Sequence, residues 1–362
     1  MKRVLILGVN GFIGHHLTHR ILRATRWIVY GMDMHAGRVE RFLRHPRFHF
    51  FQGDIRRNHG WIERHVSKCD VVLPLVAIAT PSAYIQRPLE VFELDFEANL
   101  EVVRSCVRLG KRVVFPSTSE VYGMCRDERF DPDRSELVLG PISKQRWIYA
   151  CCKQMLDRVI WAYGTERSLD FTLFRPFNWI GPGLDNLNAA KEGSSRVVTQ
   201  FIGHIARGEQ IKLVDGGGQK RSFTDIEDGI EALMRIIHNP RGVATGKIYN
   251  IGNPDNNLSI RELARLMLAI AAEFPEWSRS ASRVRMIDVS ADAYYGPAYQ
   301  DMANRRPEIE ATCHDLGWRP SIGMEESLRR LFAFYRSELR AAGELLTGAQ
   351  DLADTTPHAD AA

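Results

Sequence analysis

The fold is decided by the stretch Val4-Leu5-Ile6-Leu7-Gly8-Val9-Asn10-Gly11-Phe12-Ile13-Gly14. An apolar run of strand length leads into three glycines, and the apolar residues after them recur with the 3.6-residue period of a helix. Glycines in such a turn permit a tight bend and let the backbone approach a pyrophosphate, to which the helix N-terminus offers its N–H groups. We therefore expect a dinucleotide site containing Gly8, Asn10, Gly11, Phe12, Ile13 and Gly14. The strand and helix around the glycines argue against a turn without a ligand.

Short apolar runs and helical patterns continue to alternate through the first half of the chain. Strands are expected at residues 27–31, 48–51, 71–75, 113–115 and 171–174, and a long helix at 147–168. This alternation is typical of an α/β fold in which a doubly wound parallel sheet carries helices on both faces.

The second half has a different character. It contains a Gly- and Asn-rich stretch at 178–195, a short strand at 211–214 and a turn of three glycines at 216–218. We expect a dinucleotide-binding lobe at 1–175 with returning segments at about 225–252, and a smaller substrate lobe at 176–340. Residues 341–362 are rich in Ala, Thr and Asp, and we expect this tail to be disordered because little apolar surface offsets its chain entropy.

Composition narrows the class of protein. The 362 residues are 44% apolar and 25% charged, which is typical of a globular protein. The excess of Lys and Arg over Asp and Glu, 48 − 44 = 4, is scattered, which argues against nucleic acid and tolerates an anionic substrate. The six cysteines form no C-x-x-C pair, so we expect free thiols and no metal site. No run approaches the roughly 18 apolar residues of a membrane span, and the N-terminal run is too short for a signal peptide; we expect a cytoplasmic location.

Two carboxylates extend the dinucleotide site. Asp33 ends the second expected strand 33 − 14 = 19 residues after Gly14, where a carboxylate bonds the adenosine ribose hydroxyls. It would repel a 2′-phosphate and so favours NAD over NADP, although His35 and Arg38 keep NADP open. Asp54 and Ile55 follow the third strand and are expected beside the adenine ring; taken alone, Asp54 reads as an ordinary loop carboxylate.

A second group of residues indicates redox chemistry. Tyr149 and Lys153 stand four residues apart on the long helix and therefore share a face. A tyrosine with a pKa near 10 needs a neighbouring cation to act as a base at neutral pH. The Ser117–Glu120 run follows the fifth strand at its carboxyl end, where Thr118 or Ser119 could donate to the reacting oxygen. Together these residues predict oxidation of a carbinol. The alternative is a purely structural pair, in which the tyrosine packs at the helix surface beside a solvated lysine.

These motifs, with Thr118–Gly123 and Arg175–Asn178, resemble the extended short-chain dehydrogenases/reductases that act on nucleotide sugars. A closer resemblance is to the dehydrogenase domain of the bifunctional polymyxin-resistance proteins, over Arg3 to about Phe334. It rests on the runs 74–81, 115–125, 174–179, 184–189 and 294–296. The formyltransferase domain of that family has no counterpart in this sequence, so formyl transfer is expected to be absent.

The resemblance implies that the substrate is UDP-glucuronic acid, which is oxidised at C4 and then loses its C6 carboxylate as CO₂. Tyr149 and Lys153 serve the oxidation, and Glu120, Arg305 and Ser119 serve the decarboxylation. It also implies substrate contacts from Ala79, Tyr84, Arg146, Asn178, Lys212, Arg221 and Tyr299. Spacing alone places Lys212, Gln219, Lys220 and Arg221 around the glycine turn, where they suit either a pyrophosphate or solvent.

Several alternatives share these motifs. One is a UDP-xylose synthase that retains NADH and reduces the ketone again; others are a 4-epimerase, a 4,6-dehydratase and a non-catalytic NAD-binding regulator. The resemblance also implies a homodimer formed through the helices at 89–109 and 147–163. Cys151 and Cys152, between the catalytic pair, are interpreted as packing residues.

Overall fold

The structure is a computed structural model that describes residues 1–187 and 195–341. The chain divides into two compact units, and each is described by itself. Unit 1 consists of Met1–Trp179, Gln219–Leu258 and Ser290–Ile322. Unit 2 consists of Ile180–Gly218, Ser259–Val289 and the segment from Gly323. Tyr299 and Arg305, which the sequence reading assigned to the smaller lobe, therefore belong to unit 1.

A seven-stranded parallel sheet forms the centre of unit 1. Its strands are β1 (Arg3–Leu7), β2 (Ile28–Asp33), β3 (Phe48–Gln52), β4 (Val71–Pro74), β5 (Arg112–Pro116), β6 (Phe171–Pro176) and β11 (Lys247–Ile251). Their order is β11-β6-β5-β4-β1-β2-β3, with every pair parallel. This confirms the predicted fold class. The order reverses direction on either side of β1, which places the ligand crevice of such a sheet at the carboxyl ends of β1 and β4.

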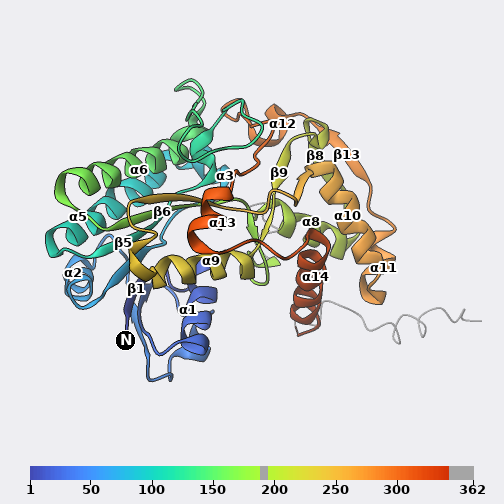
Figure 1. The fold of residues 1–362 in the computed structure, drawn as a ribbon. Coiled ribbons are helices and arrows are strands. Elements are labelled where there is room, and N and C mark those ends of the chain that lie inside the picture. Colours follow the sequence, from blue (N-terminus) through green and yellow to red (C-terminus); the bar gives the residue numbers. More distant parts are fainter. Residues whose placement is uncertain (188–194, 342–362) are drawn as a thin grey trace, which may run out of the picture. The chain divides into compact units, whose positions relative to one another are not determined.

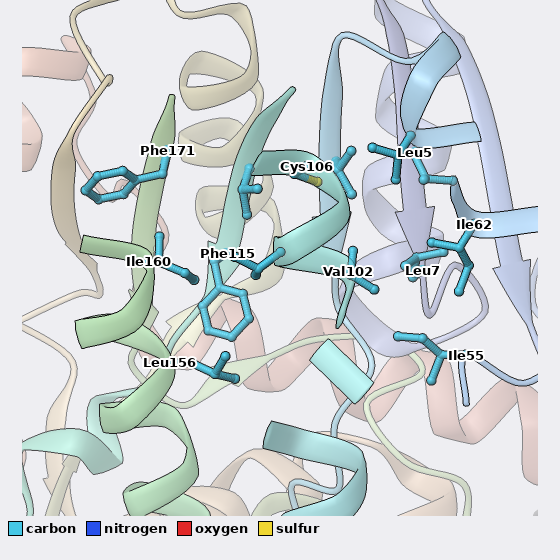
Figure 2. Close-up of a cluster of buried hydrophobic side chains, with 14 of the residues drawn as sticks. Leu5, Leu7, Ile55, Ile62, Val102, Cys106, Phe115, Leu156, Ile160 and Phe171 are labelled. Carbon is cyan, nitrogen blue, oxygen red and sulfur yellow. The ribbon is translucent and has the colours of Figure 1, made fainter. Parts of the chain in front are cut away.

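Helices cover both faces of this sheet (Figure 1). One face carries α2 (His59–Lys68), α5 (Asn99–Leu109) and α6 (Ile148–Arg167), and α1 (Phe12–Ala24) lies against α9 (Ile226–His238) on the other. Leu5 and Leu7 point to the first face and belong to one core cluster with Ile62, Val102 and Leu156, which Figure 2 shows. Val4 and Ile6 alternate with them and are fully buried toward the second face.

The segment before α5 is helical except for a break at Arg87, which has φ −138°. It begins with α3 (Pro81–Gln86) and α4 (Pro88–Phe92) and passes through the π-helical turn η2 (Glu93–Ala98). This run packs on α6 through α4 and η2. The π-helical turn matters below because it places Asp95 on the buried side.

Smaller elements complete unit 1. They are η1 (Glu40–Phe42), η3 (Ser119–Tyr122), η4 (Gln145–Trp147), β9 (Lys220–Ser222), β10 (Thr224–Asp225), η6 (Pro240–Gly242), α12 (Ala291–Tyr295) and α13 (Glu310–Leu316). The strands β7 (Trp179–Ile180) and β12 (Asn257–Ser259) contain the boundary residues. A backbone bridge between Phe130 and Pro307 joins the segment after β5 to the one that carries Arg305.

Unit 2 is mostly helical. It contains α8 (Val197–Arg207), β8 (Ile211–Val214), η5 (Asp215–Gly217), α10 (Ile260–Ala272), α11 (Pro275–Ala281), β13 (Met286–Val289) and α14 (Met324–Ala341). β8 and β13 pair in parallel. The side chains of Ser259 and Glu262 form a reciprocal capping box at the start of α10. The buried ring of Trp277 meets Phe332 edge-on at 5.3 Å and fixes α11 against α14.

Most expected elements occur within one or two residues of their predicted bounds. The expected tail begins at residue 341, and residues 342–362 lie outside the described part of the chain. All six cysteines are free thiols, as expected. Cys152 is buried and fits the packing interpretation, but Cys151 is exposed, so the interpretation is wrong for that residue because its side chain faces away from the core. No helix within the described ranges is long and apolar enough to cross a bilayer.

Replacement of Gly14 by Ala is expected to destabilise the protein. The added Cβ would lie 2.3 Å from the carbonyl oxygen of Gly8 and 2.8 Å from Cα of Val9, and both are backbone atoms that cannot yield locally. We expect a loss of about 1–3 kcal/mol in the free energy of unfolding, measured by urea denaturation. The control is Gly60→Ala on α2, where nothing lies within 4 Å of the added methyl and helix propensity gains up to about 1 kcal/mol. Equal stability of the two variants would contradict the close packing of the turn.

Candidate active site

The turn after β1 forms a cradle that only glycine can line. Gly8 has φ +88°, and a Cβ there would lie 3.1 Å from the backbone nitrogen of Val76. Gly11 is exposed at the N-cap of α1, and no side chain caps this helix end. The N-terminus of α1 therefore faces the turn with main-chain atoms alone, which is the arrangement that binds a pyrophosphate. Phe12 is buried, and Ile13 and Asn10 are half-buried beside it.

Asp33 ties the end of β2 to this turn. Its Oδ2 atom accepts the backbone N–H of Asn10 at 2.9 Å, and the side-chain oxygen of Asn10 accepts the N–H of Arg38 at 2.7 Å. Burial raises the pKa of Asp33, although the backbone N–H groups of Asn10, His35 and Met34 oppose it. The carboxylate lies next to the glycine turn, where a ribose would be bound.

Asp54 and Ile55 lie just after β3, but their side chains have other partners. Asp54 forms an ion pair with Arg56 at 2.7 Å, and this hydrogen bond lowers the pKa of the carboxyl group. The Ile55 side chain is 4% exposed and belongs to the core shown in Figure 2. A contact from Ile55 to an adenine ring would therefore involve its main chain.

Tyr149 and Lys153 meet the carboxyl end of β5. Lys153 is buried and its Nζ donates to the carbonyl oxygen of Pro116 at 3.0 Å. The ring of Tyr149 stacks on Tyr84 with centroids 4.8 Å apart and an angle of 4°. Burial raises the pKa of the Tyr149 phenol, and a hydrogen bond with the Thr118 side chain lowers it. The sequence-predicted Tyr, Lys and Thr are thus brought together in one buried place.

Two buried carboxylates flank Lys153, and neither was predicted as a site residue. Burial lowers the pKa of Lys153, whereas Asp95 and Asp157 raise it. Asp157 accepts hydrogen bonds from Ser117 at 2.7 Å and from Arg175 at 3.1 Å, so it already has a cation of its own. Burial raises the pKa of Asp95 to about 6. In the sequence, Asp95 stands four residues after Val91, which places an acidic residue on the apolar face of a helix. This spacing was the signal that could have identified Asp95, and the structure shows Val91 fully buried.

Glu120 holds two arginines from distant parts of the chain. Its Oε2 accepts from Arg146 at 2.9 Å and its Oε1 from Arg305 at 3.1 Å, and Arg305 also donates to Ser119 Oγ at 3.3 Å. All four side chains are buried. Burial opposes ionisation of Glu120, but Arg146 and Arg305 outweigh it and lower the pKa of the carboxyl group. These residues therefore lie in the interior and not at the protein surface.

A second buried ion pair lies beside this one. Arg221 pairs with Asp301 and also donates to the carbonyl oxygen of Met302 at 2.8 Å. Asp301 was missed in the sequence because no motif marks it. Arg146 lies over the ring of Tyr299, with its guanidinium carbon 5.5 Å from the centroid. Within residues 1–187 and 195–341, Glu120 and Asp301 are the carboxylates that pair with Arg146, Arg221 and Arg305, which leaves one positive charge in excess.

Some guanidinium groups of this cluster lack acceptors. In the described part of the chain, the Nε and Nη1 atoms of Arg146 and the Nε atom of Arg305 are buried and have no hydrogen-bond partner. Unpaired buried donors and an excess of positive charge are both relieved by an anion. The arrangement is therefore suited to an acidic ligand.

The other residues that the sequence predicted as substrate contacts come from several different segments. Asn178 has φ +37° and donates to the carbonyl oxygen of Ser222 at 2.9 Å, and Ala79 is exposed. Gln219 is half-buried and Lys220 exposed, both in unit 1, whereas Lys212 belongs to β8 of unit 2. Residues 1–187 and 195–341 contain no group of three potential metal ligands.

Comparison with known families identifies the protein class. The NAD dependent epimerase/dehydratase family matches residues 4–252, which is most of the chain. The chain belongs to this family. NAD is accordingly the cofactor of this epimerase/dehydratase family member, and the glycine turn, the uncapped N-terminus of α1 and the neighbouring Asp33 carboxylate fit it.

Solved structures agree with this assignment. The PbgP3 protein from Burkholderia pseudomallei is 62% identical, with a TM-score of 0.86 over 96% of this chain and 99% of that one. The UDP-glucuronic acid 4-epimerase from Bacillus cereus, solved with UDP-glucuronic acid and NAD, is 18% identical, with a TM-score of 0.77 over 93% and 99%. The dTDP-glucose 4,6-dehydratase from Streptomyces venezuelae is 22% identical, with a TM-score of 0.77 over 94% and 98%. The last two similarities show the shared fold.

Replacement of Glu120 by Gln is expected to destabilise the fold by about 3 kcal/mol, because it leaves two buried arginines without their carboxylate. The folded-state pKa of Glu120 is lowered, so its contribution is fully present above the unfolded value of about 4.3 and is lost as the pH falls through the folded value. The stability gap between wild type and variant should therefore close in acid, as measured by denaturant unfolding at several pH values. Glu128→Gln, whose side chain is 84% exposed, is the control and should change little. A gap that stays constant with pH would contradict the ion-pair role.

Proposed function

We propose that this chain is an NAD-dependent dehydrogenase that decarboxylates UDP-glucuronic acid and releases a UDP-4-keto-pentose, CO₂ and NADH. The observation that carries the proposal is the buried cluster of Arg146, Arg221 and Arg305, which has one positive charge in excess and N–H groups without acceptors. The C6 carboxylate or the diphosphate of UDP-glucuronic acid would balance this charge and accept from the unpaired N–H groups of the described residues.

In the first half-reaction the hydroxyl group on C4 loses its proton, and C4 itself loses a hydride. Bound NAD supplies the acceptor for the hydride. Tyr149 takes the hydroxyl proton, and Lys153 stabilises the resulting phenolate through its positive charge. Thr118, which shares a hydrogen bond with Tyr149, and Ser119 are placed to orient the reacting oxygen. Burial excludes water from this proton transfer.

In the second half-reaction the new ketone lies β to the C6 carboxylate. Loss of CO₂ leaves its electron pair on the C4–C5 unit as an enolate, which then takes a proton at C5. The family resemblance assigns Glu120, Arg305 and Ser119 to this step, and their mutual contacts at 3.1 and 3.3 Å support a joint role. Arg305 supplies the positive charge that faces the departing carboxylate or the enolate, and Glu120 holds Arg305 in place.

The remaining predicted residues are proposed to bind UDP and the sugar. Arg221 and Tyr299 lie in the same buried cluster as Arg146, which supports a role near the diphosphate or the sugar. Tyr84 lies against Tyr149 and is proposed to line the sugar end with Ala79. We propose further contacts from Asn178, Lys212, Gln219 and Lys220.

The main alternative product is UDP-xylose, which forms if NADH stays bound and reduces the ketone. The same residues serve both outcomes, and the difference of a few kcal/mol in NADH affinity decides between them. A 4-epimerase acting on UDP-linked neutral sugars would also bring a diphosphate to the excess positive charge, and the choice of substrate in the assay below separates it from the decarboxylase. A non-catalytic regulator has no use for the buried Tyr149 and Lys153 pair.

Purified protein given UDP-glucuronic acid and NAD should form stoichiometric NADH and a UDP-4-keto-pentose, identified by absorbance and NMR. Tyr149→Phe is expected to lower turnover by about 10²–10⁴-fold, because the base is removed. Binding of NAD and UDP-glucuronic acid should persist in calorimetry. Tyr163→Phe, on the same helix, is the control.

UDP-xylose with little free NADH would favour the alternative product. Turnover of UDP-glucose or UDP-galactose with none of UDP-glucuronic acid would point to an epimerase and would contradict the proposal.

We also propose a homodimer, supported by apolar side chains on the outer surface of the helices. Met155 and Trp161 on α6 are 52% and 45% exposed, and Leu89 on α4 is 73% exposed. Met155→Glu combined with Trp161→Glu should convert a dimer to a monomer in size-exclusion chromatography with light scattering. Leu43→Glu, at an exposed apolar residue outside these helices, should leave the dimer intact. A wild-type monomer would refute the proposal.

A further inference from the structure

The environment of Lys153 contains one carboxylate that no step above uses. Asp157 accepts hydrogen bonds from Arg175 and Ser117, as described. The charges of Asp157 and Arg175 offset each other within the core. Asp95 has no comparable cation of its own. Among the charged groups that act on it, Lys153 is the only one that favours its ionised form.

Asp95 is held in place by a single hydrogen bond. Its Oδ1 atom accepts the backbone N–H of Ile78 at 2.8 Å, and its side chain is fully buried. Within the described residues, the Oδ2 atom is buried and has no hydrogen-bond partner. A carboxylate retained for hydrogen bonding alone is different: Asp228 uses both oxygens to accept from the backbone and side chain of Ser321 and the backbone of Ile322.

The elements packed around Asp95 contribute few other charges. The π-helical turn packs on α6, and the Asp95 carboxylate acts electrostatically on Tyr149, Cys152 and Lys153 of that helix and on Tyr84 of α3. The charges of Glu120 and Arg305, which belong to the arginine cluster, also act on the pKa of Tyr149. Among the described residues, Lys153, buried on the helix against which the π-helical turn packs, is the cation whose charge acts on Asp95.

We propose that Asp95 is a positioning residue whose negative charge keeps Lys153 protonated and so sets the pH range in which Tyr149 can take the substrate proton. The inference rests on the proposed function only for the role of Tyr149; the effect on Lys153 is a property of the protein alone. An amide at position 95 would keep the bond to Ile78 and remove only the charge. The neighbouring Asn99, whose amide donates to three carbonyl oxygens, shows that this buried face accepts an amide.

The charge acts on both members of the pair in the same direction. The Asp95 carboxylate raises the pKa of Tyr149 and the pKa of Lys153. Its removal should therefore move both ionisations, and with them both limbs of a bell-shaped rate profile, toward lower pH. Because burial raises the pKa of Asp95 to about 6, wild type and an uncharged variant should converge below that pH and diverge above it.

The first measurement is an NMR titration of lysine labelled with ¹³C at Cε, without cofactor or substrate. Lys153→Arg assigns the Lys153 signal. In Asp95→Asn the midpoint of Lys153 should fall by about one to three pH units relative to wild type. Glu97→Gln, which removes a charge from an exposed position of the same π-helical turn, should leave it unchanged. Asp95→Ser provides the same neutralisation if Asp95→Asn does not fold.

The second measurement is the pH profile of NADH formation from UDP-glucuronic acid. A shift of both limbs to lower pH in Asp95→Asn, with recovery in Asp95→Glu, supports the proposal. An unmoved Lys153 midpoint, or a rate reduced equally at every pH, assigns Asp95 to packing and overturns it. Absence of turnover in wild type refutes the proposed function instead, and the Lys153 titration still decides the role of Asp95.

Discussion

The hydrogen bond from Lys153 to the carbonyl oxygen of Pro116 is the contact on which the site depends. It joins the first turns of α6 to the last residue of β5 and so favours one placement of the helix relative to the end of the strand. Tyr149, one turn earlier on the helix, is thereby brought beside Thr118, two residues past the strand. Since a lysine has three donors, this bond leaves two for a ligand or a counter-charge.

Charge is distributed unevenly around this contact. On the Lys153 side, two carboxylates meet two cations; on the Glu120 side, three guanidinium groups meet two carboxylates. The buried charges on the Lys153 side balance each other. Those on the Glu120 side leave one positive charge, which an anion would offset. Arg175 also donates to the Tyr122 hydroxyl at 2.9 Å, and this hydroxyl donates to Asn250 Oδ1 at 2.7 Å. These side chains extend the hydrogen-bond network beneath the site.

Local patterns in the sequence were sufficient for the sheet and for half of the site. The glycine turn, Asp33 and the Tyr149–Lys153 pair are defined by short spacings that a helix or a turn converts directly into proximity. The pairing of Glu120 with Arg305 spans 185 residues and was predicted only through resemblance, because no local spacing encodes it. Asp301 and Asp95 have no such motif; their roles depend on which cation the fold brings near them. Cys151 was misjudged because helical periodicity alone did not show which face of α6 is covered.

The distance along the chain between Glu120 and Arg305 also determines when this protein can acquire its chemistry during synthesis. The glycine turn, Tyr149 and Lys153 leave the ribosome well before β11, which adds the last strand of the sheet, and Arg305 follows later still. Until then Glu120 has only Arg146 as a partner, and the segment with Tyr299 and Asp301 is missing. A nascent chain can therefore form much of the dinucleotide cradle while it still lacks the arginine that completes the buried cluster. Assembly of the arginine cluster is therefore a late event of translation.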